Sequence, residues 1–160
     1  MKKTKKKYAD RSDLEKLKSQ WTKIQGLHSR EEWSAGVVRA ATAAEIAANI
    51  IIRHRLNDSN LEPDFIDHLL RWSNGIQGKM QKLIQPLCKD LYEKADFSKM
   101  QKLVNEINKE RNDIVHSGYF CSEKKSREII EKSRQFIIMA LKSSHANIEG
   151  TMKQVEPPTM

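Results

Sequence analysis

The chain has 160 residues, of which 38% are hydrophobic and 31% charged, and its formal net charge is +8 at pH 7. This length suits one domain with its own core rather than two, and six glycines and four prolines are too few for a turn-rich β fold. Because Leu, Ala, Glu, Lys, Gln and Met dominate the composition, we expect a soluble helical protein.

The first nine residues carry much of the positive charge. Five lysines lie between residues 2 and 7, and without them the net charge falls from +8 to +3, so the basic pI supports nucleic-acid binding only weakly. We expect residues 1–9 to be a basic disordered tail that either adds nonspecific affinity for phosphate or only aids solubility. No apolar stretch follows the tail, so we do not expect a signal peptide.

Two helices are predicted between residues 10 and 55. The first covers residues 10–27, because four apolar residues recur there at spacings of three and four: Leu14, Leu17, Trp21 and Ile24. Ser29 followed by Glu32 has the form of a capping box. We therefore expect the second helix to begin there and to run to about residue 55.

The second helix is apolar on nearly all sides from residue 40 to residue 52. Such a helix belongs in the centre of a bundle or in a dimer interface, and this run is too short to span a membrane. Glu45 is the only acid in it, and a buried carboxylate needs a cation. The cation that pairs with Glu45 is expected to be Arg111 or the nearby Arg39.

The remaining chain predicts three or four more helical segments. The third has Pro63 in its first turn, and the fourth follows a break at residues 74–78 and is disturbed by Pro86. The fifth begins at a cap formed by Asp96 or Ser98 and ends at Gly118. The sixth begins at a cap formed by Ser122. The fold class expected is an all-α bundle of five or six helices over residues 10–148, followed by a flexible C-terminal tail over residues 149–160.

The fifth helix places a cation on its apolar face. Arg111 falls among four residues that share this face: Met100, Val104, Ile107 and Ile114. A guanidinium is almost never buried without a partner. Arg111 is therefore expected either to pair with a buried acid or to line an interface or a cleft.

The same turns carry a histidine. Asn112 and His116 are four residues apart and share a face, whereas Arg111 and His116 are separated by about 140° on an ideal helix. The latter two meet if the helix end unwinds near Gly118 or if a second chain supplies the other half. Arginine binds phosphate and histidine transfers protons near neutral pH, although a histidine at a helix C-terminus also complements the helix dipole.

The segment Arg111–Gly118, late in a helix and followed by another amphipathic helix, resembles the Arg-polar-x-x-x-His signature of the HEPN superfamily (higher eukaryotes and prokaryotes nucleotide-binding domains). The Ala-rich second helix around Glu45 resembles the central helix of that family. The resemblance covers roughly residues 29–143. It implies a homodimer whose fifth helices face each other across a symmetric cleft.

The resemblance also implies a metal-independent endoribonuclease that needs no cofactor. Arg111 would bind the scissile phosphate, His116 would transfer a proton to or from the ribose 2′-OH or the leaving oxygen, and Asn112 would orient His116 or the phosphate. Glu45 and Tyr119 would be supporting residues. Tyr119 stands three residues after the histidine, whereas some family toxins have a tyrosine two residues after it.

The implied partners are RNA, a second copy of the chain, and an antitoxin or defence-system protein, since many such enzymes act in prokaryotic toxin–antitoxin or antiviral systems. The alternative is a noncatalytic helical RNA-binding or protein-assembly module that uses the same dimer surface. Lys124, Lys125 and Arg127 follow the motif and form either an RNA-guiding surface or a solvated helix face. Cys88 and Cys121 do not suggest a disulfide framework, so we expect a cytoplasmic location.

Overall fold

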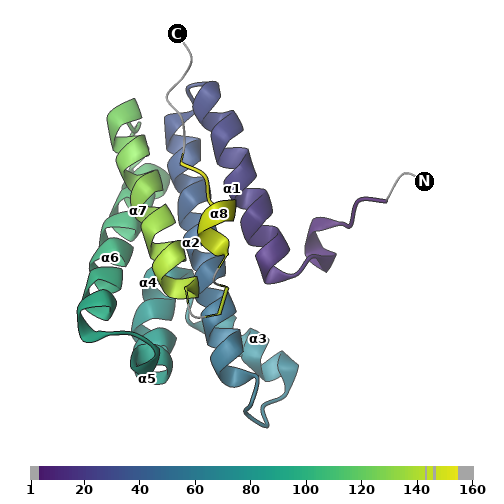
Figure 1. The fold of residues 1–160 in the computed structure, drawn as a ribbon. Coiled ribbons are helices and arrows are strands. Elements are labelled where there is room, and N and C mark those ends of the chain that lie inside the picture. Colours follow the sequence, from purple (N-terminus) through teal and green to yellow (C-terminus); the bar gives the residue numbers. More distant parts are fainter. Residues whose placement is uncertain (1–3, 143, 146, 155–160) are drawn as a thin grey trace.

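The computed structural model describes residues 4–142, 144–145 and 147–154, and these residues form an all-α bundle that contains no strand (Figure 1). The predicted fold class is therefore confirmed at the level of a helical bundle. The α-helices are α1 (Asp13–Ser29), α2 (Trp33–Leu56), α3 (Pro63–Trp72), α4 (Gly75–Lys79), α5 (Gln85–Cys88), α6 (Lys94–Ser117), α7 (Glu123–Leu141) and α8 (Ile148–Thr151).

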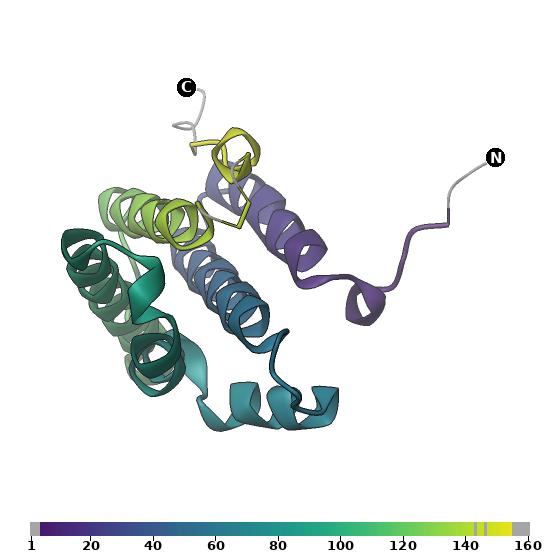
Figure 2. The same ribbon diagram turned by 60° about the horizontal axis from the view of Figure 1, so that its bottom comes forward.

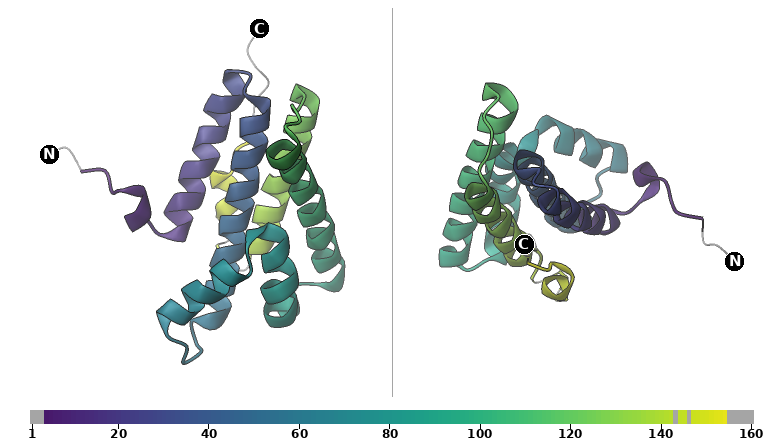
Figure 3. Two further views of the ribbon diagram at one scale, coloured as in Figure 1. Left: turned by 180° about the vertical axis from the view of Figure 1, so that it is seen from behind. Right: turned by 90° about the horizontal axis from the view of Figure 1, so that it is seen from above.

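Helix α2 is the centre of the bundle. Helix α1 packs along one side of it and α7 and α6 along the other, an arrangement visible from below in Figure 2 and from behind and above in Figure 3. Its buried alanines include Ala40, Ala44 and Ala47, whose small side chains let the neighbouring helices approach closely. By length and composition α2 could cross a membrane, but 67% of its most apolar stretch is buried inside the bundle, as expected of a core helix.

The predicted helix ends are only partly correct. The capping box at Ser29 is wrong, because Ser29 lies in the last turn of α1 and its hydroxyl donates to the Gly26 carbonyl (2.9 Å). A reversal through Glu31, which has a positive φ of 62°, then leads into α2 at Trp33 without a side-chain cap. Ser122 does cap α7, since its Oγ accepts a hydrogen bond from the Lys125 amide (3.1 Å).

Helix α6 begins earlier than predicted, at Lys94 after Glu93. Asp96 and Ser98 therefore lie inside the helix rather than at its N-cap. In the first turn, Asp96 complements the positive end of the helix dipole. Pro63 occupies the first turn of α3, as predicted.

The break predicted near residues 74–78 is present, and the chain beyond it is irregular. After the turn at Asn74, α4 leads directly into one stretch of π-helix at Met80–Ile84. Pro86 follows at the start of α5, and Ile84 and Gln85 before it are helical, so the helix continues through this position. A proline removes the hydrogen bond to the carbonyl four residues before it and crowds that carbonyl. For Pro86 this carbonyl belongs to Lys82, within the π-helical stretch, so the irregularity lies where the proline predicts it.

The folded part of the chain extends past the predicted boundary at residue 148. Met152 is fully buried, and the Trp21 indole N–H donates to the Lys153 carbonyl (2.9 Å). The flexible tail predicted from residue 149 onward therefore starts too early, because residues 149–153 include the end of α8 and pack on α1. Residues 155–160 of that predicted tail lie outside the described residues.

The described part of the predicted N-terminal tail contacts α1. Residues Tyr8–Asp10 form a short 3-10 turn, and the Tyr8 hydroxyl accepts a hydrogen bond from Gln20 Nε2 (2.7 Å). The Lys6 ammonium lies 3.5 Å from Glu15, with both side chains exposed. Residues 1–3 of the tail lie outside the described residues.

His28 is a buried polar residue at the end of α1. It is fully buried, and neither ring nitrogen has a hydrogen-bond partner within the described part of the chain. Its ring packs edge-on against that of Trp33, with centroids 4.6 Å apart. Burial, reinforced by the charge of Arg127 on α7 and partly opposed by Glu123, lowers the pKa of His28 from its ordinary value of 6.5, so the fold favours the neutral imidazole.

Acidification is therefore expected to destabilise the protein through His28. Because the pKa of His28 is lower in the folded state, the stability that the neutral ring contributes is present above pH 6.5 and is lost as the pH falls below it. His28→Phe keeps the ring shape and should reduce the fall in melting temperature between about pH 7.5 and about pH 5.5. Thermal unfolding followed by circular dichroism measures this change.

The exposed His54 provides the matched control, since its neutral substitution His54→Asn should leave the pH dependence as in the wild type. An unchanged pH dependence in His28→Phe would show that His28 is not the titrating group.

Candidate functional site

The C-terminal half of α6 lines a pocket of about 410 Å³ together with α2 and the segment at the start of α4. Helix α6 contributes Asn108, Arg111, Asn112 and His116. Helix α2 contributes Ala41, Thr42 and Glu45, and the facing wall consists of residues 74–78 and Gln81. The three predicted catalytic residues and Glu45 therefore lie around one pocket.

Helix α6 remains regular through the motif. It continues to Ser117 and ends at Gly118, whose φ of 63° gives the left-handed conformation typical of a helix C-terminus. Arg111 and His116 therefore line the pocket from positions about 140° apart around the helix axis. The unwinding near Gly118 that would bring them together within one chain does not occur, which leaves a second chain as the other route.

Arg111 has no acidic partner among the described residues. It is half-buried, and its Nη1 donates to the Asn112 Oδ1 (3.1 Å). The buried ion pair considered from the sequence is thus not formed, and Arg111 lines a pocket instead. Since a guanidinium has five N–H donors, most of them are free for a ligand in the pocket.

Glu45 pairs with neither arginine considered for it. Its carboxylate accepts a hydrogen bond from the Lys79 ammonium (3.0 Å), while Arg39 donates to Gln20 (2.8 Å) instead. The predicted contact between Glu45 and Arg111 is therefore wrong, and so is the alternative with Arg39. Lys79, with a side chain only 4% exposed, also donates to the Leu70 carbonyl (2.9 Å).

Gln77 connects the facing wall of the pocket to α6. Its Oε1 accepts from Asn108 Nδ2 (2.7 Å), and its Nε2 donates to Asn105 Oδ1 (3.1 Å). These two hydrogen bonds attach the facing wall to α6 about one helical turn before Arg111. Asn108 and Arg111 then face the same pocket, so the wall fixes how wide the pocket opens beside the motif.

Lys79 and Gln77 were missed by sequence reasoning. Lys79 follows Ile76 by three residues and precedes Leu83 by four, so it occupies an apolar position of its helix. This is the same signal that singled out Arg111. Gln77 carried no such signal, because its role depends on a partner 31 residues away.

Tyr119 lies beyond the end of α6 and does not line the pocket. Its side chain is 44% exposed, and the following Phe120 is 89% exposed. The backbone N–H of Cys121 then donates to the Ser34 Oγ on α2 (2.9 Å), which anchors this loop.

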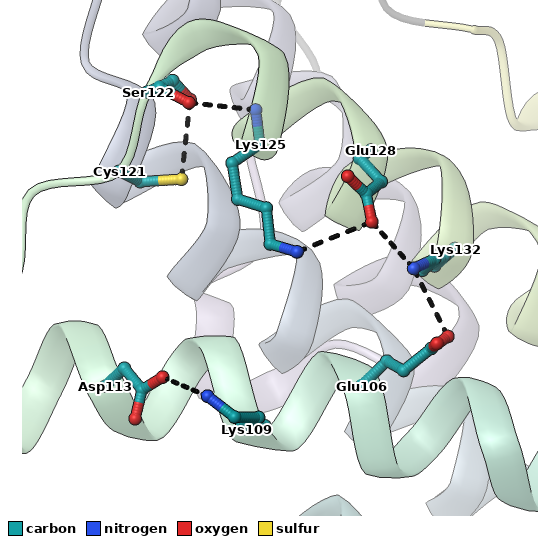
Figure 4. A network of polar contacts seen from close by, with 8 residues as sticks. All are labelled: Glu106, Lys109, Asp113, Cys121, Ser122, Lys125, Glu128 and Lys132. Carbon is teal, nitrogen blue, oxygen red and sulfur yellow. Dashed lines mark hydrogen bonds and ion pairs between the residues drawn. The ribbon is translucent and has the colours of Figure 1, made fainter.

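The basic residues that follow the motif are on the first turns of α7 and do not line the pocket. Figure 4 shows one of them, Lys125, among its polar contacts. Lys125 pairs with Glu128 (3.4 Å), and Glu128 also pairs with Lys132 (2.8 Å). The Lys132 ammonium also lies 3.3 Å from the Glu106 carboxylate on α6. The hydrogen bond from Lys132 to Glu128 raises the pKa of Lys132. Lys125 thus belongs to an ion-pair network that joins α7 to α6.

Lys124 and Arg127 are the other two residues of the predicted RNA-guiding set. Lys124 is exposed and Arg127 is half-buried. Arg127 is near enough to His28 to lower the pKa of that histidine.

Both cysteines are free and buried. Burial raises the pKa of the Cys88 thiol and of the Cys121 thiol to about 11 each, and Glu110 adds to the effect at Cys121. Both thiols therefore stay protonated at neutral pH, which makes them poor nucleophiles.

Within the described ranges, no group of three or more His, Cys, Asp or Glu side chains is arranged to hold a metal ion. Comparisons of the chain with models of protein families, with curated proteins and with solved structures found no match. The chemistry of the pocket is therefore argued from its own residues.

Proposed function

We propose that this protein is a metal-independent endoribonuclease of HEPN type that acts as a homodimer in the cytoplasm, in a prokaryotic toxin–antitoxin or antiviral defence system. The observation that supports this most is Arg111, a half-buried guanidinium without an acidic partner in the described chain, in the same pocket as His116. A cation held in a pocket and left unneutralised is suited to bind a phosphate.

The proposed reaction is attack of the ribose 2′-OH on the adjacent phosphorus. The 2′-oxygen forms a bond to phosphorus and gives its proton to a base, while the bond to the 5′-oxygen breaks and that oxygen takes a proton from an acid. The products are a 2′,3′-cyclic phosphate and a 5′-hydroxyl. Arg111 would stabilise the charge that develops on the phosphate, and His116 would act as the base or the acid.

Asn112 has a positioning role in this proposal. Its Oδ1 accepts a hydrogen bond from Arg111 (3.1 Å), so it would hold the guanidinium rather than His116. The His116 side chain forms no hydrogen bond within the described residues, so Asn112 does not orient it here.

A second copy of the chain would complete the site. The base and the acid act on opposite sides of the phosphorus, because the attacking and leaving oxygens are in line, and one His116 cannot occupy both sides. A shallow groove lined by Val38 and Ile114 shares Thr42 with the pocket, and Val115, the residue after Ile114, is 46% exposed. This apolar surface next to the motif supports a dimer contact there.

The proposal predicts cleavage of RNA in the presence of EDTA that depends on Arg111 and His116. Arg111→Ala should lower the rate about 10²–10³-fold, and His116→Ala about 10²–10⁴-fold. The rate and the 2′,3′-cyclic phosphate end are measured on labelled RNA after denaturing electrophoresis. The control is Lys102→Ala, an exposed position on α6 outside the pocket, which should cleave like the wild type.

Wild-type cleavage that survives both substitutions would overturn the assignment of the site. RNA binding without cleavage of any substrate would favour the noncatalytic module, in which the same pocket binds RNA but does not cut it.

A further inference from the structure

A second pocket of about 540 Å³ adjoins the first, since Glu45 and Asn74 line both. Its other lining residues are Asn49, Arg53, Asp67, Leu70, Arg71 and Lys79. It lies between α2 and the C-terminal end of α3. A polymer bound in the first pocket can therefore continue into the second.

Arg71 is the cation in this pocket that a ligand can use. Arg53 is engaged by Asp13 (3.0 Å) and Asp67 (2.7 Å), and Lys79 is engaged by Glu45. Arg71 is exposed and forms no ion pair or side-chain hydrogen bond within the described part of the chain. With three cationic and two acidic side chains, the lining has a net charge of +1.

Trp72, the residue after Arg71, is an exposed aromatic residue at the end of α3. It lies two residues before Asn74, and its side chain is 54% exposed. The Lys82 ammonium lies 4.7 Å from the centre of its ring. An indole that stays in water forgoes the large gain from burial. An exposed aromatic ring with a cation close by is an arrangement on which single-stranded nucleic acids stack.

We propose that Arg71, Trp72 and Lys82 form a subsite for an unpaired nucleotide next to the scissile phosphate. Its base would stack on Trp72, and its phosphate would contact Arg71 and Lys82. This inference rests on the proposed function and names its substrate class, single-stranded RNA. A base inside a duplex is already stacked on its neighbours and is not free to stack on an indole.

The first test uses the fluorescence of Trp72 itself. An unpaired RNA oligonucleotide should quench the fluorescence of the wild-type protein, and a duplex of the same sequence should quench it far less. The quench should be largely lost in Trp72→Phe, which keeps an aromatic ring and therefore most of the affinity. An equal quench in Trp72→Phe would overturn the subsite.

The second test measures affinity for unpaired RNA by fluorescence anisotropy of a labelled oligonucleotide. Trp72→Ala should weaken binding about 5- to 150-fold, the range for loss of one base–aromatic stack. Arg71→Ala should weaken binding and lower the slope of log affinity against log salt by about one. The control is Phe65→Ala, since Phe65 is 47% exposed on the same helix but lies at its other end, away from Arg71 and Lys82.

The proposed subsite and the proposed nuclease activity can be tested independently of each other. Trp72→Ala should raise KM and leave kcat nearly unchanged, whereas Arg111→Ala should lower kcat. If Trp72→Ala and the wild type bind and cleave unpaired RNA equally, the subsite is wrong and the nuclease stands. If the wild type binds unpaired RNA but does not cleave it, the nuclease proposal is wrong. The difference in RNA affinity between the wild type and Trp72→Ala then still tests the subsite.

Two further results would also overturn the subsite. One is a wild-type protein that binds no RNA. The other is a Trp72→Ala variant whose mass in sedimentation equilibrium changes while its RNA affinity does not, because Trp72 would then be a contact between copies of the chain.

Discussion

Glu45→Ala is expected to lower the free energy of unfolding by about 3 kcal/mol, the lower end of the cost of leaving one member of a buried ion pair without its partner, because the Glu45 side chain is itself 35% exposed. The substitution leaves the Lys79 ammonium, in a side chain that is 4% exposed, with only the Leu70 carbonyl as its partner. Urea unfolding followed by circular dichroism measures the loss.

The double variant Glu45→Ala, Lys79→Met is the companion of this experiment. It removes both charges and fills the position of the lysine with an apolar chain, so it should regain most of the stability lost in Glu45→Ala. Arg55→Ala breaks an exposed pair with Asp90 and should cost less than about 1 kcal/mol. If Glu45→Ala costs no more than Arg55→Ala, the buried pair does not stabilise the fold as argued.

The same pair affects the pocket. Lys79 holds the Glu45 carboxylate at 3.0 Å, and Glu45 lines the pocket that contains Arg111. Lys79→Met should therefore release a carboxylate toward the guanidinium and lower RNA cleavage, and adding Glu45→Ala should restore cleavage. Activity that recovers in the double variant would separate this electrostatic effect from a loss of folded protein.

Gly78→Ala is expected to destabilise the protein by about 3 kcal/mol, at the upper end of the cost of overpacking. A Cβ at this position would lie 2.2 Å from the Ser73 carbonyl oxygen and 3.0 Å from its carbon. Both atoms belong to the backbone, so no side-chain rotation relieves the clash. The chain near Asn74, which lines both pockets, would have to move, and the melting temperature and urea midpoint should both fall.

Gly26→Ala is the matched control for Gly78→Ala. Gly26 lies inside α1, and a Cβ there would meet only the end of the Arg30 side chain at 3.5 Å. Because glycine is a poor helix former, this substitution should stabilise the protein by about 0.5–1 kcal/mol. A Gly78→Ala protein as stable as the wild type would show that the close approach to Ser73 is not needed.

Part of the pocket was predictable from helical spacing alone. Arg111 stands on the apolar face of its helix, so it had to pair with an acid or line a cavity, and the structure shows that it lines the pocket. Asn112 and His116 share this pocket because they lie on the same helix one turn apart.

The facing wall of the pocket was not predictable in this way. The partner of Glu45 is Lys79, 34 residues away, and Gln77 reaches Asn108 from 31 residues away. Such contacts depend on how α4 packs against α2 and α6, which no local pattern contains. The nearest arginine in sequence, Arg39, was the wrong partner because it faces Gln20 on α1.

The sequence alone determined the helical content, the apolar character of α2 on nearly all sides and the placement of Arg111 on an apolar face, because each of these follows from spacing within one helix. Only the tertiary structure decided which groups neutralise each other. It pairs Glu45 with Lys79 and leaves Arg111 with Asn112. The physical reason is that an ion pair forms within a few ångströms in space, and only the packing of α4 against α2 brings Lys79 that close.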